Sequence, residues 1–250
     1  MTSDSQKSSA RPRQNNDGAA KLRVLDLFCC EGGAGMGYHL AGFDVTGVDL
    51  YPQPRYPFTF IQADCLTLEP AWIRRNFDAI HASPPCQFGT ALKHAPNAKK
   101  HNNLIPATRK LLKATGLPYI IENVEAVARA GHMINPICLC GSMFGLGSGS
   151  YQLRRHRYFE SNVTIGSAGA CKHLDYPVIG IYGGHVRCRA AKHGGRKTRD
   201  FVGYDKPAMA AEAMGMPWAT MAGMSEAIPP AYTRYLGLQL MQQLSQAEAA

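Results

Sequence analysis

The chain has 250 residues, 45% of them hydrophobic, and carries 27 Lys and Arg against 18 Asp and Glu. This length suits one sizeable α/β domain and argues against a second large one, and the absence of a long apolar run predicts a soluble protein. Eight cysteines without a secretory signal favour a reducing, cytoplasmic setting, in a bacterium or a virus-infected cell, where thiols stay free.

Residues 1–20 are polar and lack the patterns of targeting peptides, so they predict a disordered tail. Beyond them, apolar runs typical of buried strands alternate with helical patterns. This alternation predicts a Rossmann-like, doubly wound, mostly parallel α/β sheet over 21–160, which binds ligands at the carboxyl ends of its strands. The predicted strands are 22–28, 45–50, 58–64, 77–83 and 118–124, and the predicted helices include one ending at Gly42, 70–77 and 103–115.

The periodicity fades near residue 160, and 161–223 predicts a small, irregular and basic recognition region. Residues 151–210 hold 11 Lys and Arg against 4 Asp and Glu, which suits a phosphate backbone, although a solvated basic surface is the alternative. A helix is predicted at 207–215. The segment 224–246 carries a final helix, at 228–244, which we expect to return and pack on the sheet beside the first helix.

A glycine cluster, EGGAGMG, follows the first strand at 31–37 and is typical of nucleotide-binding turns. Neither Gly33 nor Gly35 starts a complete G-x-G-x-x-G, which weakens a dinucleotide-binding oxidoreductase. Asp49 ends the second strand, where it could accept hydrogen bonds from ribose, and Asp64 follows the third, within reach of an adenine amino group. These features fit S-adenosylmethionine, although both acids could instead cap turns.

Five short motifs occur in the order typical of one enzyme family. They are DLF with EGG at 26–33, SPPCQ at 83–87, ENV at 122–124, QLRRHR at 152–157 and IPP at 228–230. In this order they resemble the C5-cytosine DNA methyltransferases, over roughly residues 22–244. The resemblance implies double-stranded DNA as the partner, S-adenosylmethionine as the cofactor and, we expect, a monomer.

The resemblance also implies roles for individual residues. Cys86 would add to C6 of a flipped-out cytosine, which activates C5 for methyl transfer. Glu122 would bind the far edge of the base, Asn123 would brace the loop, and Arg154 and its neighbours are candidates for lowering the thiol pKa. The implied cofactor contacts are Phe28, Gly32, Gly33, Asp49, Asp64 and Pro84, and the implied substrate contacts are Gln87, Gln152, His156 and Arg157. Residues 89–103 resemble the mobile loop that closes over DNA.

Three positions depart from the family pattern. Cys30 stands where a glycine is usual, His156 occupies the last arginine position of Q-x-R-x-R with Arg157 one step beyond, and Glu226 replaces an asparagine. Two further interpretations stay open, an RNA cytosine-5 methyltransferase and a catalytically silent nucleic-acid-binding relative. Metal binding was weighed for the pairs Cys138-x-Cys140 and Cys171-x-His173, but their one-residue gaps are tighter than usual zinc spacing, so no metal ligand is predicted.

Overall fold

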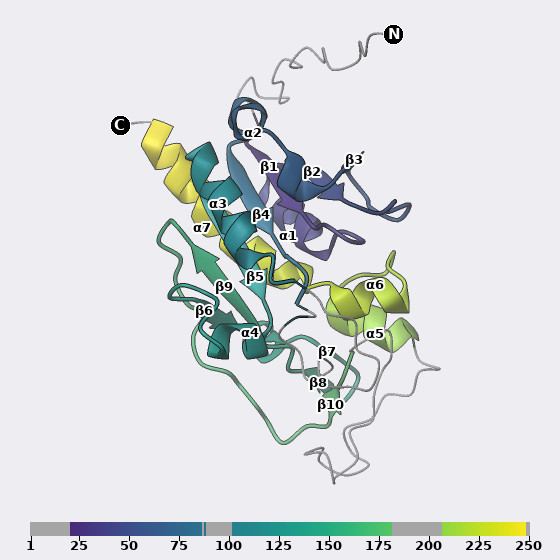
Figure 1. Ribbon diagram of the computed structural model, residues 1–250. Helices are drawn as coiled ribbons and strands as arrows, with labels where there is room; N and C mark the ends of the chain where they lie inside the picture. The colour runs from purple at the N-terminus through teal and green to yellow at the C-terminus, as the bar shows by residue number, and fades with distance from the viewer. Residues whose placement is uncertain (1–20, 87, 89–101, 182–206, 249–250) are drawn as a thin grey trace.

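The computed structural model describes residues 21–86, 88, 102–181 and 207–248, so the predicted tail lies outside the described residues. Its centre is a sheet of seven strands: β1 (Arg23–Leu27), β2 (Asp44–Asp49), β3 (Thr59–Gln62), β4 (Ala79–Ala82), β5 (Tyr119–Asn123), β6 (Ile137–Leu139) and β9 (Arg157–Ser161). Their order is β3-β2-β1-β4-β5-β9-β6 (Figure 1). Among these strands only β9 runs in the opposite direction, so it is antiparallel to β5 and β6. The other described pairs are parallel, and the sheet is mostly parallel, as predicted.

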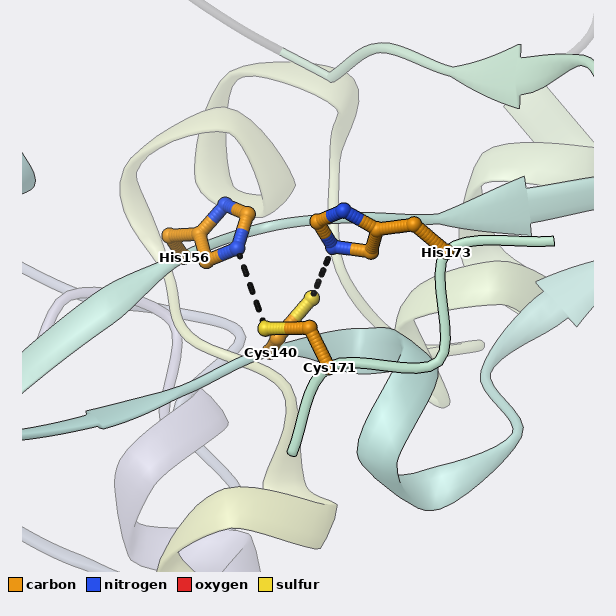
Figure 2. A group of neighbouring side chains, drawn as sticks. All are labelled: Cys140, His156, Cys171 and His173. Carbon is orange, nitrogen blue, oxygen red and sulfur yellow. Dashed lines mark hydrogen bonds between the residues drawn. The ribbon is translucent and has the colours of Figure 1, made fainter. Parts of the chain in front are cut away.

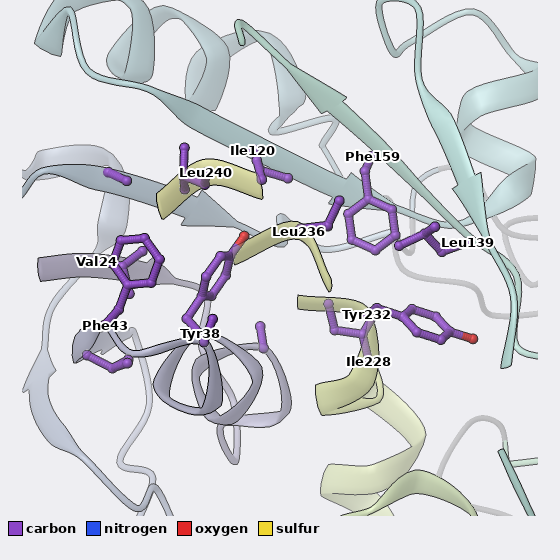
Figure 3. Packing of buried hydrophobic residues seen from close by; sticks show 14 residues of the cluster. Val24, Tyr38, Phe43, Ile120, Leu139, Phe159, Ile228, Tyr232, Leu236 and Leu240 are labelled. Atoms are coloured by element: carbon purple, nitrogen blue, oxygen red, sulfur yellow. The ribbon is translucent and has the colours of Figure 1, made fainter. Parts of the chain in front are cut away.

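Helices cover both faces of this sheet. The helices that the structure describes are α1 (Gly33–Ala41), α2 (Pro70–Asn76), α3 (Ile105–Thr115), α4 (Glu125–Arg129), α5 (Pro207–Met214), α6 (Met221–Glu226) and α7 (Pro230–Glu248), with 3-10 turns η1 (Cys65–Thr67) and η4 (Gly141–Phe144). Side chains alternate along β1, so Val24 packs with α1 and α7 while Leu25 packs with α2 and α3. Figure 3 shows the first of these two cores. No helix in the described part of the chain is long and apolar enough to cross a membrane.

The final helix lies directly against the first. A methyl group added at Gly37 of α1 would overlap the Pro230 carbonyl and the Thr233 hydroxyl of α7, so only glycine allows this approach. The Thr233 hydroxyl donates a hydrogen bond to the Ala34 carbonyl at 2.8 Å. Residues 224–226 belong to α6 rather than to the last helix, because Pro229 and Pro230 start α7 anew.

The sheet order changes direction at β1, whose two neighbours are β2 and β4. Ligands of doubly wound sheets bind at such a switch point, outside the carboxyl ends of the strands. The turn 28–32 follows β1, and the loop 83–86 follows β4. Both therefore lie at the edge where a ligand site is expected.

The sequence did not predict the short strands after residue 130. Besides β6 and β9, these form a three-stranded sheet of β7 (Gly147–Ser148), β8 (Tyr151–Leu153) and β10 (Val178–Ile179), which packs with α5 and α6. Strand β9 was not predicted because it contains two charged residues, Arg157 and Glu160, which are nevertheless buried. Glu160 accepts two hydrogen bonds from Arg109, at 2.6 and 2.7 Å, which offsets the cost of burying its charge.

Arg155 connects the strands near the site to the last helices. Its side chain is 1% exposed and donates to the carbonyls of Ile181, Ser225 and Ala227. Tyr232 of α7 donates in turn to the Arg155 carbonyl at 2.6 Å. One buried guanidinium thus satisfies backbone carbonyls from two segments that are distant in sequence, one at Ile181 and one at 225–227.

Replacing this guanidinium tests its structural role. Arg155→Met keeps an unbranched side chain but removes the guanidinium and leaves buried carbonyls without donors, so we expect the free energy of unfolding to fall by about 3 kcal/mol. Urea denaturation measures the change. The exposed Arg74→Met on α2 is the matched control and should stay within about 0.5 kcal/mol of the wild type. An equal, small change in both variants would contradict the role.

Asp26 is a fully buried acid at the centre of β1. The Tyr56 hydroxyl donates to its Oδ2 at 3.2 Å, while Oδ1 has no hydrogen-bond partner among the described residues. Burial raises the pKa of Asp26 from 3.8 to about 8, against the lowering effect of hydrogen bonds from Tyr56 and the Gly35 backbone. The folded protein therefore retains a proton that the unfolded chain releases.

A group whose pKa is raised by folding stabilises the fold at low pH, and this contribution is lost as pH rises toward the folded pKa. For Asp26, stability should fall by up to about 1.4 kcal/mol per pH unit between about pH 5 and 7. Asp26→Asn should flatten this part of the pH dependence in urea denaturation. The exposed Asp44→Asn on the neighbouring strand is the control. Identical slopes for the wild type and Asp26→Asn would rule the contribution out.

Candidate active site

The turn from β1 to α1 has an unusual backbone. Phe28, Cys30 and Gly32 have φ values of 59°, 45° and 84°, in the left-handed region. Glycine adopts this region without strain, which explains why a glycine is usual at the position of Cys30. The cysteine is accommodated here with its side chain 3.9 Å from Glu226 Oε2, measured from Sγ. Two positions that depart from the family pattern are thus in contact.

The two predicted cofactor acids have different surroundings. Asp49, at the end of β2, is 8% exposed and accepts hydrogen bonds from the backbone N–H of Cys30 at 3.0 Å and of Tyr51 at 3.1 Å. It therefore joins β2 to the turn. Asp64 is exposed, and its side chain accepts a hydrogen bond from the Leu66 N–H at 2.9 Å. This contact caps η1, which is the turn-capping role given above as the alternative to cofactor binding.

Glu31 belongs to this turn and makes contacts that the sequence did not predict. Its carboxylate accepts from the Thr220 backbone N–H at 2.6 Å and from the Thr220 hydroxyl at 2.7 Å, and its carbonyl accepts from the Trp218 indole at 2.8 Å. The turn is thereby attached to the segment between α5 and α6. A Glu ahead of a glycine cluster gave no local signal for a partner 189 residues away.

Cys86 and Glu122 come from neighbouring parallel strands. Cys86 follows β4 and Glu122 lies in β5, where Ala82 pairs with Ile121. Asn123 donates from Nδ2 to the Pro84 carbonyl at 2.9 Å, and its Oδ1 accepts from the Val124 N–H at 3.0 Å. The loop that carries the thiol is therefore attached to the strand that carries the carboxylate.

A buried ion pair orients that carboxylate. Arg157 Nε lies 3.1 Å from Glu122 Oε1, and the two side chains are 10% and 9% exposed. Burial raises the pKa of Glu122, while the charge of Arg157 and a hydrogen bond from Ser83 act in the opposite direction. Arg157 was predicted as a substrate contact and is also the direct partner of this acid.

The thiol of Cys86 responds to the same charges. Burial and then the Glu122 carboxylate raise its pKa, and the largest opposing charges are those of Arg157 and Arg155. Arg154 and its neighbours were the predicted candidates for this positive charge, and the charges that act are those of the neighbours Arg157 and Arg155 rather than that of Arg154. Its guanidinium donates instead to Gln152 Oε1, at 2.9 Å, and to the Leu174 carbonyl.

The remaining predicted substrate contacts face the segment 171–174. Gln152 donates to the Lys172 carbonyl at 2.7 Å, and His156 Nε2 lies 3.4 Å from Cys171 Sγ. The nearby thiol of Cys140 is subject to burial, which raises its pKa, but hydrogen bonds to His156, Ser142 and His173 lower the pKa to about 6. Gln87, residues 89–101 of the predicted mobile loop and the basic segment 182–206 lie outside the described residues.

Arg155, the fully buried member of this motif, was predicted only as one of the neighbours of Arg154 and was not singled out. It lies between Arg154 and His156 in a run of basic residues, and such a run indicates a solvated or nucleic-acid-binding surface. Arg155 differs from Arg154 and His156 in being buried, and the sequence alone does not reveal which residues of the run are buried. Its charge nonetheless acts on both Cys86 and Glu122.

No known family profile and no curated protein matches this sequence. Solved structures do. One is a prophage-encoded candidate DNA modification methyltransferase from E. coli, with a TM-score of 0.59 and 16% identity over 90% of this chain and 100% of the other. Others are the S. pombe Dnmt2 methyltransferase, with a TM-score of 0.54 and 15% identity, and the Entamoeba histolytica methyltransferase EhMeth, with 0.50 and 11%; each match covers 90% of this chain and 99% of the other.

At these identities the likeness establishes the architecture of the chain. The mostly parallel seven-stranded sheet and its helices match the fold of these methyltransferases. The chain has the fold of the S-adenosylmethionine-dependent methyltransferases.

Proposed function

We propose that the protein is an S-adenosylmethionine-dependent DNA cytosine-5 methyltransferase. The observation that carries this proposal is the arrangement of Cys86 and Glu122 at the ends of neighbouring parallel strands, with Asn123 bonded to the loop between them. A nucleophilic thiol beside a buried carboxyl is what covalent activation of a cytosine ring requires. The fold similarity to DNA-modifying proteins supports the same class of reaction.

The turn after β1 suits a positively charged cofactor that carries an adenosine. Buried Asp49 and solvent-exposed Glu226 both contact Cys30, and Asp49 also raises the pKa of the Glu226 carboxyl, after the larger effect of desolvation. Two acids crowded together gain from a nearby positive charge, which the sulfonium and ammonium groups of S-adenosylmethionine would bring. When bound, this cofactor supplies the electrophilic methyl group. Phe28, Gly32 and Gly33 form the turn against which it would lie, and Pro84 begins the loop opposite.

The residues of the chain prepare the base for that group. Cys86 attacks C6 of the cytosine as a thiolate, forming a carbon–sulfur bond, and electron density moves toward C5 and N3. Glu122 stabilises this charge by hydrogen bonding at N3, and its raised pKa lets the carboxyl carry a proton to share there. Once C5 has taken up the methyl group, it would lose its proton and the carbon–sulfur bond to Cys86 would break, which restores the ring and returns Cys86 as a thiolate. Arg157 fixes the carboxyl in place throughout.

The target base has to leave the helical stack to reach Cys86, because its C6 lies within the stacked duplex. Duplex DNA is the proposed substrate, and the cationic excess of residues 151–210 suits its phosphates. A structured RNA bearing cytosine offers the same ring chemistry. The silent relative differs from both enzymes, since it would bind nucleic acid without forming any bond to sulfur.

A covalent trap tests the proposal. With S-adenosylmethionine and duplex DNA that contains 5-fluorocytosine, fluorine at C5 blocks the final elimination, so the protein should stay bound through Cys86 and migrate as a denaturation-resistant complex. Cys86→Ser should abolish this complex. Cys138→Ser, at a half-buried thiol on β6, is the control and should retain it. A complex formed with fluorocytosine RNA but not with DNA would favour the RNA enzyme, and none with either would favour the silent relative.

Removal of the Glu122 proton tests the second catalytic group. Glu122→Gln keeps the shape of the side chain but cannot titrate, so kcat should fall by about 10²–10⁴-fold while binding of S-adenosylmethionine is retained. Because burial raises the Glu122 pKa, its proton persists to higher pH than on an ordinary Glu, and this titration should vanish from the pH–rate profile of the variant. Glu125→Gln, which breaks only a surface pair with Arg129, is the control. An unchanged profile in Glu122→Gln would exclude the carboxyl from proton transfer.

A further inference from the structure

Four metal-ligating side chains converge at the edge of the sheet, away from the proposed catalytic pair. Figure 2 shows Cys140, His156, Cys171 and His173 pointing toward one another, and their ligand atoms all lie within 4.8 Å of each other. Cys140 Sγ is 3.4 Å from His173 Nε2, and Cys171 Sγ is 3.4 Å from His156 Nε2. Two thiols and two imidazoles thus alternate around one point.

The two sulfur–nitrogen separations match the edges of a zinc tetrahedron. With Zn–S bonds of about 2.3 Å and Zn–N bonds of about 2.0–2.1 Å, tetrahedral angles place sulfur about 3.6 Å from nitrogen and the two sulfurs about 3.8 Å apart. Both sulfur–nitrogen distances observed here fall within about 0.2 Å of the first value. Small movements of the side chains would complete the coordination.

The ligands come from elements that the fold already holds in register. Strands β6 and β9 pair Leu139 with Arg157, so one further step along the register brings Cys140 opposite His156. Cys138 is excluded because its thiol contacts the Leu139 carbonyl instead. From the sequence, Cys138 and Cys140 were weighed as two ligands of one zinc site. In the structure, the antiparallel pairing of β6 and β9 instead places His156, 16 residues beyond Cys140, beside Cys140 as the second ligand.

The segment that supplies Cys171 and His173 is fixed by side chains around the cluster. The Ser142 hydroxyl accepts from the Lys172 N–H at 3.1 Å and lies 3.2 Å from Cys140 Sγ. Gln152 bonds the Lys172 carbonyl and Arg154 bonds the Leu174 carbonyl, so the backbone on both sides of His173 is held. Such supporting hydrogen bonds around the ligands are typical of metal sites.

We propose that Cys140, His156, Cys171 and His173 bind one structural zinc ion. Four protein ligands fill the tetrahedron and leave no position for a reacting water, so the ion would act on structure rather than on chemistry. Cys171 and His173 are exposed, which gives the ion a path of entry. The ion would join the start of the recognition region to the strand pair that carries Arg157, the partner of Glu122.

Metal content of the purified full-length chain tests this assignment without reference to methyl transfer. Expressed with added zinc and purified without chelators, the wild type should hold about one zinc per chain by mass spectrometry, and zinc K-edge absorption should report two sulfur and two nitrogen ligands. Replacement by Co²⁺ should give the visible bands of a tetrahedral thiolate site. Cys171→Ser and His173→Asn, both at exposed positions, should lower the zinc content at least about tenfold.

Cys138→Ser is the matched control, because it removes a cysteine two residues from a ligand and should keep the zinc. Wild-type protein with far less than one zinc per chain, or a ligand shell without sulfur, would overturn the proposal and leave a hydrogen-bonded cluster. Equal zinc loss in Cys138→Ser and Cys171→Ser would do the same. If a variant fails to fold, the zinc content and ligand shell of the wild type still decide the proposal. Neither measurement depends on whether the covalent complex with DNA forms.

Discussion

The buried ion pair between Glu122 and Arg157 connects the parallel part of the sheet to its antiparallel strand. Each charge would be costly to bury alone, and loss of either partner of such a pair typically costs about 3–5 kcal/mol. The pair therefore constrains both strands at once. Strand β5 has to present its acid beside the loop of Cys86, and β9 has to run antiparallel so that its first residue reaches the carboxyl ends of the parallel strands. The position of the proposed catalytic acid and the reversal of one strand are parts of a single arrangement.

The residues from Arg154 to Arg157 show how one basic run serves several purposes. Arg154 holds the segment at Leu174, Arg155 is buried among backbone carbonyls, His156 faces Cys171 and Arg157 pairs with Glu122. These four neighbours point to four different surroundings because the chain changes there from β8 to β9. Cationic character alone, which suggested phosphate binding, accounts for none of these contacts.

The parallel half of the fold could be predicted because its strands are short, mostly apolar segments, as at 22–28 and 118–124, that alternate with helical patterns. The glycine turn, Cys86 and Glu122 could be located because they directly follow or end such runs. Strands β6 to β10 were not predicted, since they are two to five residues long and bury charges whose partners are distant in sequence. Arg155 and Glu31 were missed for the same reason. The partner of Cys140 likewise depended on a strand register that spacing does not reveal.

The close packing of α7 against α1 has a consequence for biosynthesis. Tyr232, Leu236 and Leu240 complete the apolar cluster that begins with Val24 and Tyr38, so one face of the sheet stays uncovered while the ribosome makes the intervening 190 or so residues. Folding of the nascent chain cannot finish as its first strands emerge. Chaperones that shield apolar surface would find their target on that face, and a ribosome stalled before residue 230 would release a chain prone to aggregate.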